Sequence, residues 1–229
     1  MEQPVIYTIG HSTHRLDHFL SLLREHAIDC LVDVRSIAAS RYNPQFNKEP
    51  LNRFLRDNHI YYLHFSAEFG ARHAEPGLLD EDGKVDFEKV RNSQHFRTGL
   101  GRIRTGVGKG LRITLMCAEA NPFDCHRFAM ISVALVNEGF EVLHILKDGT
   151  VKTNRQLEKE LLEKYHNAIR RPDMFHRIGE DQQLRIAYRM RNKDITFRHF
   201  QTTYESPKTN GYCIKEVIIQ RKYVHYAIG

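Results

Sequence analysis

The sequence has no long run of hydrophobic residues, and this limits where the protein can act. None of its apolar stretches approaches the about 20 residues that a membrane-spanning helix needs. The first residues also lack the basic and then apolar segments that mark a secretory signal. We therefore expect a cytoplasmic protein with no membrane partner.

Cysteine is scarce as well, and glycine forms no nucleotide-binding motif. The chain of 229 residues has four cysteines, Cys30, Cys117, Cys125 and Cys213. Cytosolic thiols are kept reduced, and four of them in a chain of this length are not a disulfide framework. A phosphate-binding glycine loop and a dinucleotide fingerprint are both missing from the sequence. We therefore expect no cofactor, apart from the zinc considered below.

Basic residues outnumber acidic residues only in the last third of the chain, and this divides the sequence into two parts. Residues 1–150 hold 18 Lys and Arg against 19 Asp and Glu, whereas residues 151–229 hold 16 against 9. We predict an α/β domain over residues 1–150 and a basic extension over residues 151–229. Such an extension indicates a polyanionic partner, such as nucleic acid, or a solvated basic surface without a partner.

The first part alternates between short apolar runs and segments with one apolar helical face. Predicted strands cover residues 5–9, 30–34, 60–65, 111–116 and 141–145. Predicted helices between them include one over residues 87–103 and one over residues 128–136. This alternation is typical of a three-layer α/β fold, in which helices flank a mainly parallel sheet. In the extension we expect a charged helix over residues 154–165 and a small β element within residues 195–226.

The eleven residues 117–127 form the densest group of chemically active side chains. They follow a predicted strand and precede a predicted helix. The N-terminus of a helix lowers the pKa of a nearby thiol and attracts anions. The sequence therefore predicts a thiolate with acid–base partners, and the predicted catalytic residues are Cys117, Glu119, Cys125 and His126.

Polar residues also follow the other predicted strands. The carboxyl ends of parallel strands meet at one edge of a sheet, so we expect these residues beside the catalytic group. The predicted substrate-binding or anion-binding residues are His11, Ser12, Asp33, Arg35, Arg41 and Arg127. Plainer roles remain open, among them a structural ion pair between Asp33 and Arg35 and a pairing of Arg127 with a carboxylate.

Five short motifs, in order along residues 5–146, resemble a known family. They are Tyr7-Thr-Ile-Gly-His11-Ser, Leu31-Val-Asp-Val-Arg35-Ser, Ser40-Arg-Tyr-Asn-Pro-Gln-Phe-Asn47, Leu115-Met-Cys-Ala-Glu119 and Cys125-His-Arg127. Together they are similar to domain-of-unknown-function family 488. The resemblance implies a shared fold and a site at these motifs, and it implies no reaction.

The order of elements also resembles that of rhodanese-like domains. Asp33-Val-Arg35 ends an early strand, and Cys117 ends a later strand that leads into a helix and a final strand. This resemblance implies that Cys117, rather than Cys125, is the nucleophile. The loop after Cys117 is longer than a persulfide-binding loop and contains Pro122, so sulfur transfer is not predicted.

Three functions are compatible with these residues. The first is a cysteine-dependent transferase or hydrolase that acts on an anionic or nucleic-acid-related substrate. The second is a zinc site formed by Cys117, Glu119, Cys125 and His126, whose spacing is not that of a zinc ribbon. The third is a non-catalytic nucleic-acid-binding protein that stacks bases on the aromatic residues of its basic extension. We predict the first.

Overall fold

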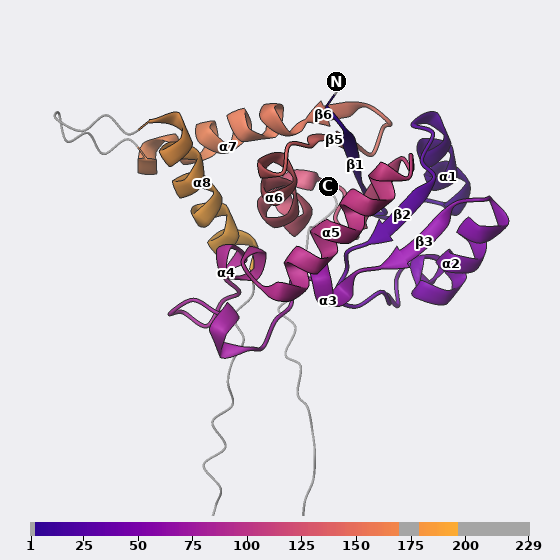
Figure 1. The fold of residues 1–229 in the computed structure, drawn as a ribbon, viewed down its shortest axis with the longest axis horizontal. Helices are drawn as coiled ribbons and strands as arrows, with labels where there is room; N and C mark the ends of the chain where they lie inside the picture. The colour runs from indigo at the N-terminus through magenta and orange to yellow at the C-terminus, as the bar shows by residue number, and fades with distance from the viewer. Residues whose placement is uncertain (1–2, 170–178, 197–229) are drawn as a thin grey trace, which may run out of the picture. The chain divides into compact units, whose positions relative to one another are not determined.

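The computed structural model describes residues 3–169 and 179–196, which build an α/β fold around a six-stranded sheet (Figure 1). The strand order is β3-β2-β4-β1-β5-β6. The strands from β1 to β5 pair in parallel, and β6 runs antiparallel to β5. Their bounds are β1 Val5–Gly10, β2 Cys30–Asp33, β3 Tyr61–His64, β4 Ile113–Cys117, β5 Glu141–Ile145 and β6 Val151–Thr153. The predicted mainly parallel sheet is therefore confirmed.

Helices cover both faces of this sheet. The α-helices are α1 Leu16–Glu25, α2 Lys48–Asp57, α3 Ser66–Phe69, α4 Phe87–Arg91, α5 Gln94–Gly108, α6 Val133–Asn137, α7 Asn154–Ile169 and α8 Glu180–Ile195. Short 3-10 turns are η1 Pro44–Phe46, η2 Pro76–Leu78 and η3 Pro122–Asp124, and η4 Arg127–Ser132 is a π-helix.

Strand β2 shows how the sequence produces three layers. Its successive side chains point to opposite faces of the sheet. Leu31 packs in the cluster formed with α1 and α2, whereas Cys30 and Val32 pack in the cluster formed with α4, α5 and α6. Because both faces are covered, β2 and β4 are buried along their whole length and consist almost entirely of apolar residues.

Two predicted helices differ in detail from those observed. The helix expected over residues 87–103 is two helices, because the side chain of Ser93 accepts a hydrogen bond from the backbone N–H of Phe96 and starts α5 there. The helix expected over residues 128–136 begins with the π-helix η4 and continues as α6. Local capping at Ser93 overrides an apolar pattern that runs through both helices.

Residues 151–196 add an edge strand and two helices to the domain. Strand β6 follows the turn after β5, and α7 and α8 pack on the ring of Phe128 through Leu157, Leu161 and Tyr188. These elements belong to the same compact unit as the sheet. The predicted β element and most of the basic extension lie outside the described residues. No helix within residues 3–169 and 179–196 is long and apolar enough to cross a membrane.

A buried histidine makes the stability of this fold depend on pH. His144 is fully buried in β5, where Nδ1 accepts a hydrogen bond from the Thr8 hydroxyl and Nε2 donates to Asn154. Burial, and then the charge of Arg127, lowers the pKa of His144 from 6.5 to about 3. At pH values between these two pKa values, the unfolded chain binds more protons than the folded chain. The free energy of unfolding that depends on the neutral, buried His144 is therefore complete above pH 6.5 and is lost as the pH falls.

We therefore expect His144→Gln to flatten the pH dependence of unfolding. Urea denaturation of the wild type should lose up to about 1.4 kcal/mol per pH unit from this histidine between pH 6 and 4.5. The variant should lose less over the same interval, although it is less stable at pH 7. Replacement of the exposed His95 by Gln serves as the control and should leave the slope unchanged. Equal slopes for the wild type and His144→Gln would contradict the prediction.

Candidate functional site

The carboxyl ends of β1, β2 and β4 lie side by side and bring three loops together. Gly10 is paired with Cys117 in the parallel register of β1 and β4. Beyond the strands, the N–H of His11 donates to the carbonyl of Cys117 over 2.9 Å, and the N–H of Val34 donates to the carbonyl of Met116 over 3.0 Å. Residues that are about a hundred positions apart in the sequence therefore lie next to each other at this edge of the sheet.

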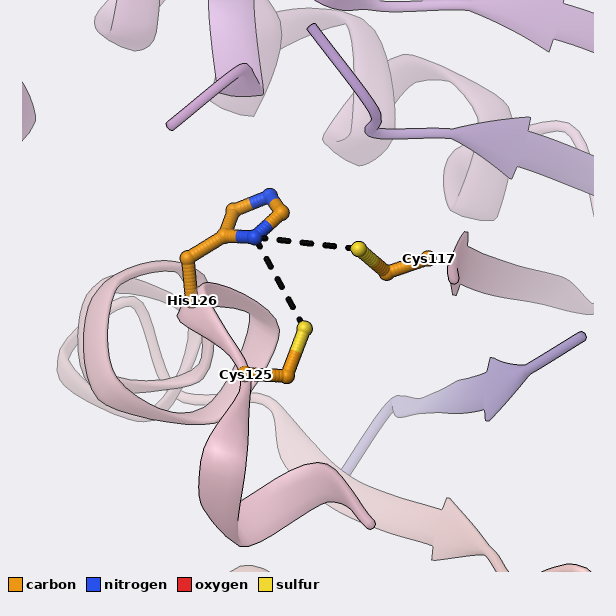
Figure 2. A group of neighbouring side chains, drawn as sticks. All are labelled: Cys117, Cys125 and His126. Atoms are coloured by element: carbon orange, nitrogen blue, oxygen red, sulfur yellow. Dashed lines mark hydrogen bonds between the residues drawn. The ribbon is translucent and has the colours of Figure 1, made fainter. Parts of the chain in front are cut away.

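Four side chains of the 117–127 loop meet at this edge, and we call them the thiol cluster: Cys117, Glu119, Cys125 and His126. The Oε2 atom of Glu119 lies 2.7 Å from Sγ of Cys117 and 3.2 Å from Sγ of Cys125. The Nδ1 atom of His126 lies 3.8 Å and 3.6 Å from the same two sulfurs (Figure 2). The structure thus brings all four predicted catalytic residues together.

The cluster is buried on the protein side and open on one side. Both cysteines and His126 are buried, whereas Glu119 is exposed. The solvent-facing side of the cluster is therefore at Glu119, whose carboxylate turns inward onto the two sulfurs.

The loop places Cys125 at the beginning of a helix. Asn121 caps the 3-10 turn η3 by accepting a hydrogen bond from the N–H of Phe123. The carbonyl of Cys125 then accepts the N–H groups of Phe128 and Ala129. The helix starts as the π-helix η4, a form that is rare in proteins and frequent at functional sites.

Arg127 supplies a buried positive charge next to the cluster. It is fully buried, and its guanidinium donates to the carbonyls of Glu119 and Ala120 over 2.7 and 3.0 Å. Its Nε has no hydrogen-bond partner, and no carboxylate of the described residues forms an ion pair with it. The charge of Arg127 therefore stabilises negative charge that develops in the cluster.

The two thiols differ in how readily they ionise. Burial opposes ionisation of Cys125, but a hydrogen bond from Cys117 and the charges of Arg127 and His126 outweigh it and hold the Cys125 pKa well below its ordinary value. The hydrogen bond with Cys125 and burial raise the pKa of Cys117. These directions favour ionisation of Cys125 over ionisation of Cys117. The role of Cys117 as the nucleophile, which the sequence favoured, stays a prediction.

The partners of Cys125 are also shifted in pKa. Burial opposes the charged form of His126, yet the negative charge of Cys125 raises its pKa. Loss of hydration and the charge of Cys125 raise the pKa of Glu119. Both shifts favour the protonated forms of His126 and Glu119 relative to the same groups in water.

A second group of side chains, after β1 and β2, forms a hydrogen-bonded network next to the thiol cluster. Arg35 donates to both oxygens of Asp33 over 2.8 and 2.6 Å and to the carbonyl of Phe46 over 2.7 Å. It also donates to Nε2 of His11 over 3.1 Å, and Tyr62 donates to Asp33 over 2.8 Å. Burial lowers the pKa of His11 to about 4, which keeps this ring neutral.

This arrangement is the structural ion pair that the sequence left open. Arg35 is hydrogen-bonded within the protein rather than directed at a ligand. Between Asp33 and Arg35, the carbonyl of Val34 accepts a hydrogen bond of 3.1 Å from Nε2 of His126. The ion pair therefore positions His126 through the backbone. The sequence did not predict the hydrogen bond of Tyr62 to Asp33, because the alternating pattern of β3 was the only feature that indicated this side chain.

The two remaining predicted residues lie apart from the cluster side chains. Ser12 contributes its backbone, whose N–H donates to the carbonyl of Ala118 over 3.0 Å, with φ of 48°. Arg41 is exposed ahead of η1, and within the described part of the chain no hydrogen bond or ion pair joins it to the thiol cluster. Its proposed role in binding an anion stays a prediction.

Comparison with known proteins gives one match. A family model described as "Domain of unknown function DUF488" matches residues 15–134, more than half of the chain. The matched segment contains the thiol cluster and the Asp33–Arg35 pair. No curated protein and no solved structure matches the chain.

Proposed function

Since the chain belongs to the family described as domain of unknown function DUF488, we propose its function from its own site: a cysteine-dependent enzyme, either a hydrolase or a transferase, whose active site is the thiol cluster. The observation that carries the proposal is the convergence of these side chains: the carboxylate of Glu119 and the imidazole of His126 each lie 2.7 to 3.8 Å from both sulfurs. Side chains of these types are used for nucleophilic and acid–base chemistry.

Each member of the cluster has a distinct role in this proposal. Cys125 carries the negative charge, with the helix N-terminus and Arg127 beside it. His126 is its proton partner, and the hydrogen bond to the carbonyl of Val34 fixes the orientation of the ring. Glu119, at the open side, transfers protons to or from a substrate. Cys117 donates a hydrogen bond and keeps the charge on Cys125.

The substrate in this proposal is anionic, because Arg127, next to the thiol cluster, forms no ion pair with a carboxylate of the described residues. Arg127 has hydrogen bonds only to backbone carbonyls among the described residues. The basic extension supports a nucleic-acid-related substrate through its charge, although most of it lies outside the described residues. Of the aromatic residues assigned to base stacking, Tyr188 is buried and donates a hydrogen bond to Glu158, which is a packing role.

Thiol labelling tests the proposal on the full-length, chelator-treated protein at pH 7. Iodoacetamide should modify Cys125 at least about 100-fold faster than Cys30, since only the thiolate reacts. Cys30 is a matched internal control, because it is equally buried and burial raises its pKa to about 11. Peptide mass mapping of timed samples separates the sites.

Turnover of chromogenic p-nitrophenyl esters, both acetate and phosphate, provides a second measurement. Cys125→Ser and Glu119→Gln should each lower the rate by about 100-fold or more, whereas Cys30→Ala should keep it. Equal labelling of Cys30 and Cys125, or a Cys125→Ser variant as active as the wild type, would contradict the proposed function.

A further inference from the structure

Three atoms of the thiol cluster are arranged as metal ligands. The Sγ atoms of Cys117 and Cys125 and Nδ1 of His126 all lie within 4.8 Å of one another and face a common point (Figure 2). The two sulfur–nitrogen distances are 3.8 and 3.6 Å. In tetrahedral zinc sites, where Zn–S is about 2.3 Å and Zn–N about 2.0 Å, ligand atoms of these types lie about 3.6 Å apart. The side chains therefore need little movement to bind one ion.

The ring of His126 has the tautomer that such a site requires. Its Nε2–H donates to the carbonyl of Val34 over 3.1 Å, so the neutral ring carries its lone pair on Nδ1, on the side of the two sulfurs. Metal-binding histidines characteristically donate their other N–H to a carbonyl or a carboxylate. The Asp33–Arg35 ion pair holds this carbonyl in place from the opposite side.

The charge and the burial of the two cysteines also favour a bound metal ion. Two thiolates in a buried site repel each other and are costly to desolvate unless a cation lies between them. A divalent ion neutralises both, and the remaining charges, Arg127 and Glu119, are opposite in sign. Thiolate and imidazole ligands in a tetrahedral arrangement select zinc among the common divalent ions.

We infer that Cys117, Cys125 and His126 bind one Zn²⁺ and that Glu119 lies beside its fourth coordination position. Three protein ligands with an open position are typical of catalytic rather than structural zinc. Glu119 is not one of the three converging ligands, yet its Oε2 contacts both sulfurs from the exposed side. Zinc bound here supplies a Lewis acid, and Glu119 accepts a proton from the attacking water.

This inference goes beyond the proposed function, because it replaces the cysteine nucleophile by a water molecule that zinc activates. It keeps the thiol cluster as the active site and selects hydrolysis over transfer. It assigns the ionised cysteines the role of ligands instead of nucleophiles. The buried position of both sulfurs behind Glu119 suits a ligand better than a group that must reach a substrate.

Metal analysis of the full-length protein, purified without a metal-affinity tag, tests the inference. Elemental mass spectrometry should find one zinc ion per chain in the purified protein, or one zinc ion per chain after reduction and dialysis against zinc sulfate alone. Cys117→Ser, Cys125→Ser and His126→Gln should each weaken zinc binding by about 100-fold or more, and Cys30→Ala should not. Cobalt substitution should give the thiolate charge-transfer and intense d–d absorption of a tetrahedral site.

A measurement on the wild type does not depend on the folding of variants. Titration with p-hydroxymercuribenzoate should release one zinc as the cluster thiols are modified. Circular dichroism of each variant separates loss of a ligand from loss of the fold.

The possible outcomes separate this inference from the proposed function. Absence of zinc after reloading, with rapid labelling of Cys125, would overturn the zinc site and leave the cysteine-dependent enzyme. Absence of zinc together with equal labelling of Cys125 and Cys30 would overturn both. Iron or copper in place of zinc would overturn the identity of the metal. Glu119→Gln should retain zinc, and its loss would make Glu119 a fourth ligand and overturn the open position.

Discussion

Replacement of Gly10 by alanine should destabilise the protein by about 3 kcal/mol or more and disrupt the thiol cluster. A Cβ atom at this position would lie 1.9 Å from the carbonyl oxygen of Glu119 and 2.8 Å from its carbonyl carbon. Both atoms belong to the backbone, so no side-chain rotation relieves the clash. Either the end of β1 or the loop after Cys117 has to move.

The consequence for the site follows from what that carbonyl binds. It accepts the 2.7 Å hydrogen bond of the buried Arg127, so a shift of the loop leaves a buried guanidinium without one of its partners. Hydrogen bonds to charged groups contribute about 1.5–3 kcal/mol, which adds to the cost of overpacking. We also expect slower labelling of Cys125, because the shift moves Glu119 and removes a hydrogen bond that holds Arg127 in place.

Gly101→Ala is the matched control for this substitution. Gly101 lies within α5 and has no atom within 4 Å of its added Cβ. Alanine there should be neutral or should stabilise the helix by up to about 1 kcal/mol. Urea unfolding followed by circular dichroism measures both variants. A Gly10→Ala variant that loses no more than about 1 kcal/mol would show that the loop adapts without strain.

Much of the fold follows from sequence periodicity, and the strands at its centre show why. The apolar runs that form β2 and β4 are covered by helices on both faces, and helical segments with one apolar face separate them. Such a pattern has few solutions other than a parallel sheet between two helical layers. The grouping of post-strand residues at one edge follows from the same topology, which is why the thiol cluster was predicted as a set.

Other features depend on interactions between distant segments and leave no local signal. The lower pKa of Cys125 relative to Cys117 comes first from the hydrogen bond between the two thiols and then from Arg127 and His126, and these contacts form only in the folded chain. The role of Arg35 depends on Tyr62 and on the carbonyl of Phe46. The ligand geometry of residues 117–126 arises because a 3-10 turn folds the loop back, and sequence spacing alone does not report this.

The buried pair of Asp33 and Arg35 should be the other position of large effect. Asp33 is fully buried and Arg35 is 6% exposed, and two parallel hydrogen bonds join them. Arg35→Met leaves a buried carboxylate without its cation, and broken buried pairs of this kind cost about 3–5 kcal/mol. The exposed pair of Arg189 and Glu88 is the control, since Arg189→Met should cost less than about 1 kcal/mol.

A double variant separates the charge from the packing. Asp33→Asn in the Arg35→Met background removes the unpaired carboxylate and should recover part of the lost free energy of unfolding. No recovery would mean that the cost comes from lost packing of the Arg35 side chain against its neighbours. Urea unfolding at pH 7 of the single and double variants gives the coupling energy.

The same variants test whether the ion pair positions the cluster or only stabilises the fold. If Arg35 holds the Val34 carbonyl against Nε2 of His126, then Arg35→Met should weaken zinc binding by about 10- to 100-fold and slow the labelling of the metal-free Cys125 thiol. Gly101→Ala and Arg189→Met should change neither quantity. A folded Arg35→Met variant with unchanged zinc affinity and labelling would limit the pair to stability, because a purely structural role affects unfolding and leaves the orientation of His126 intact.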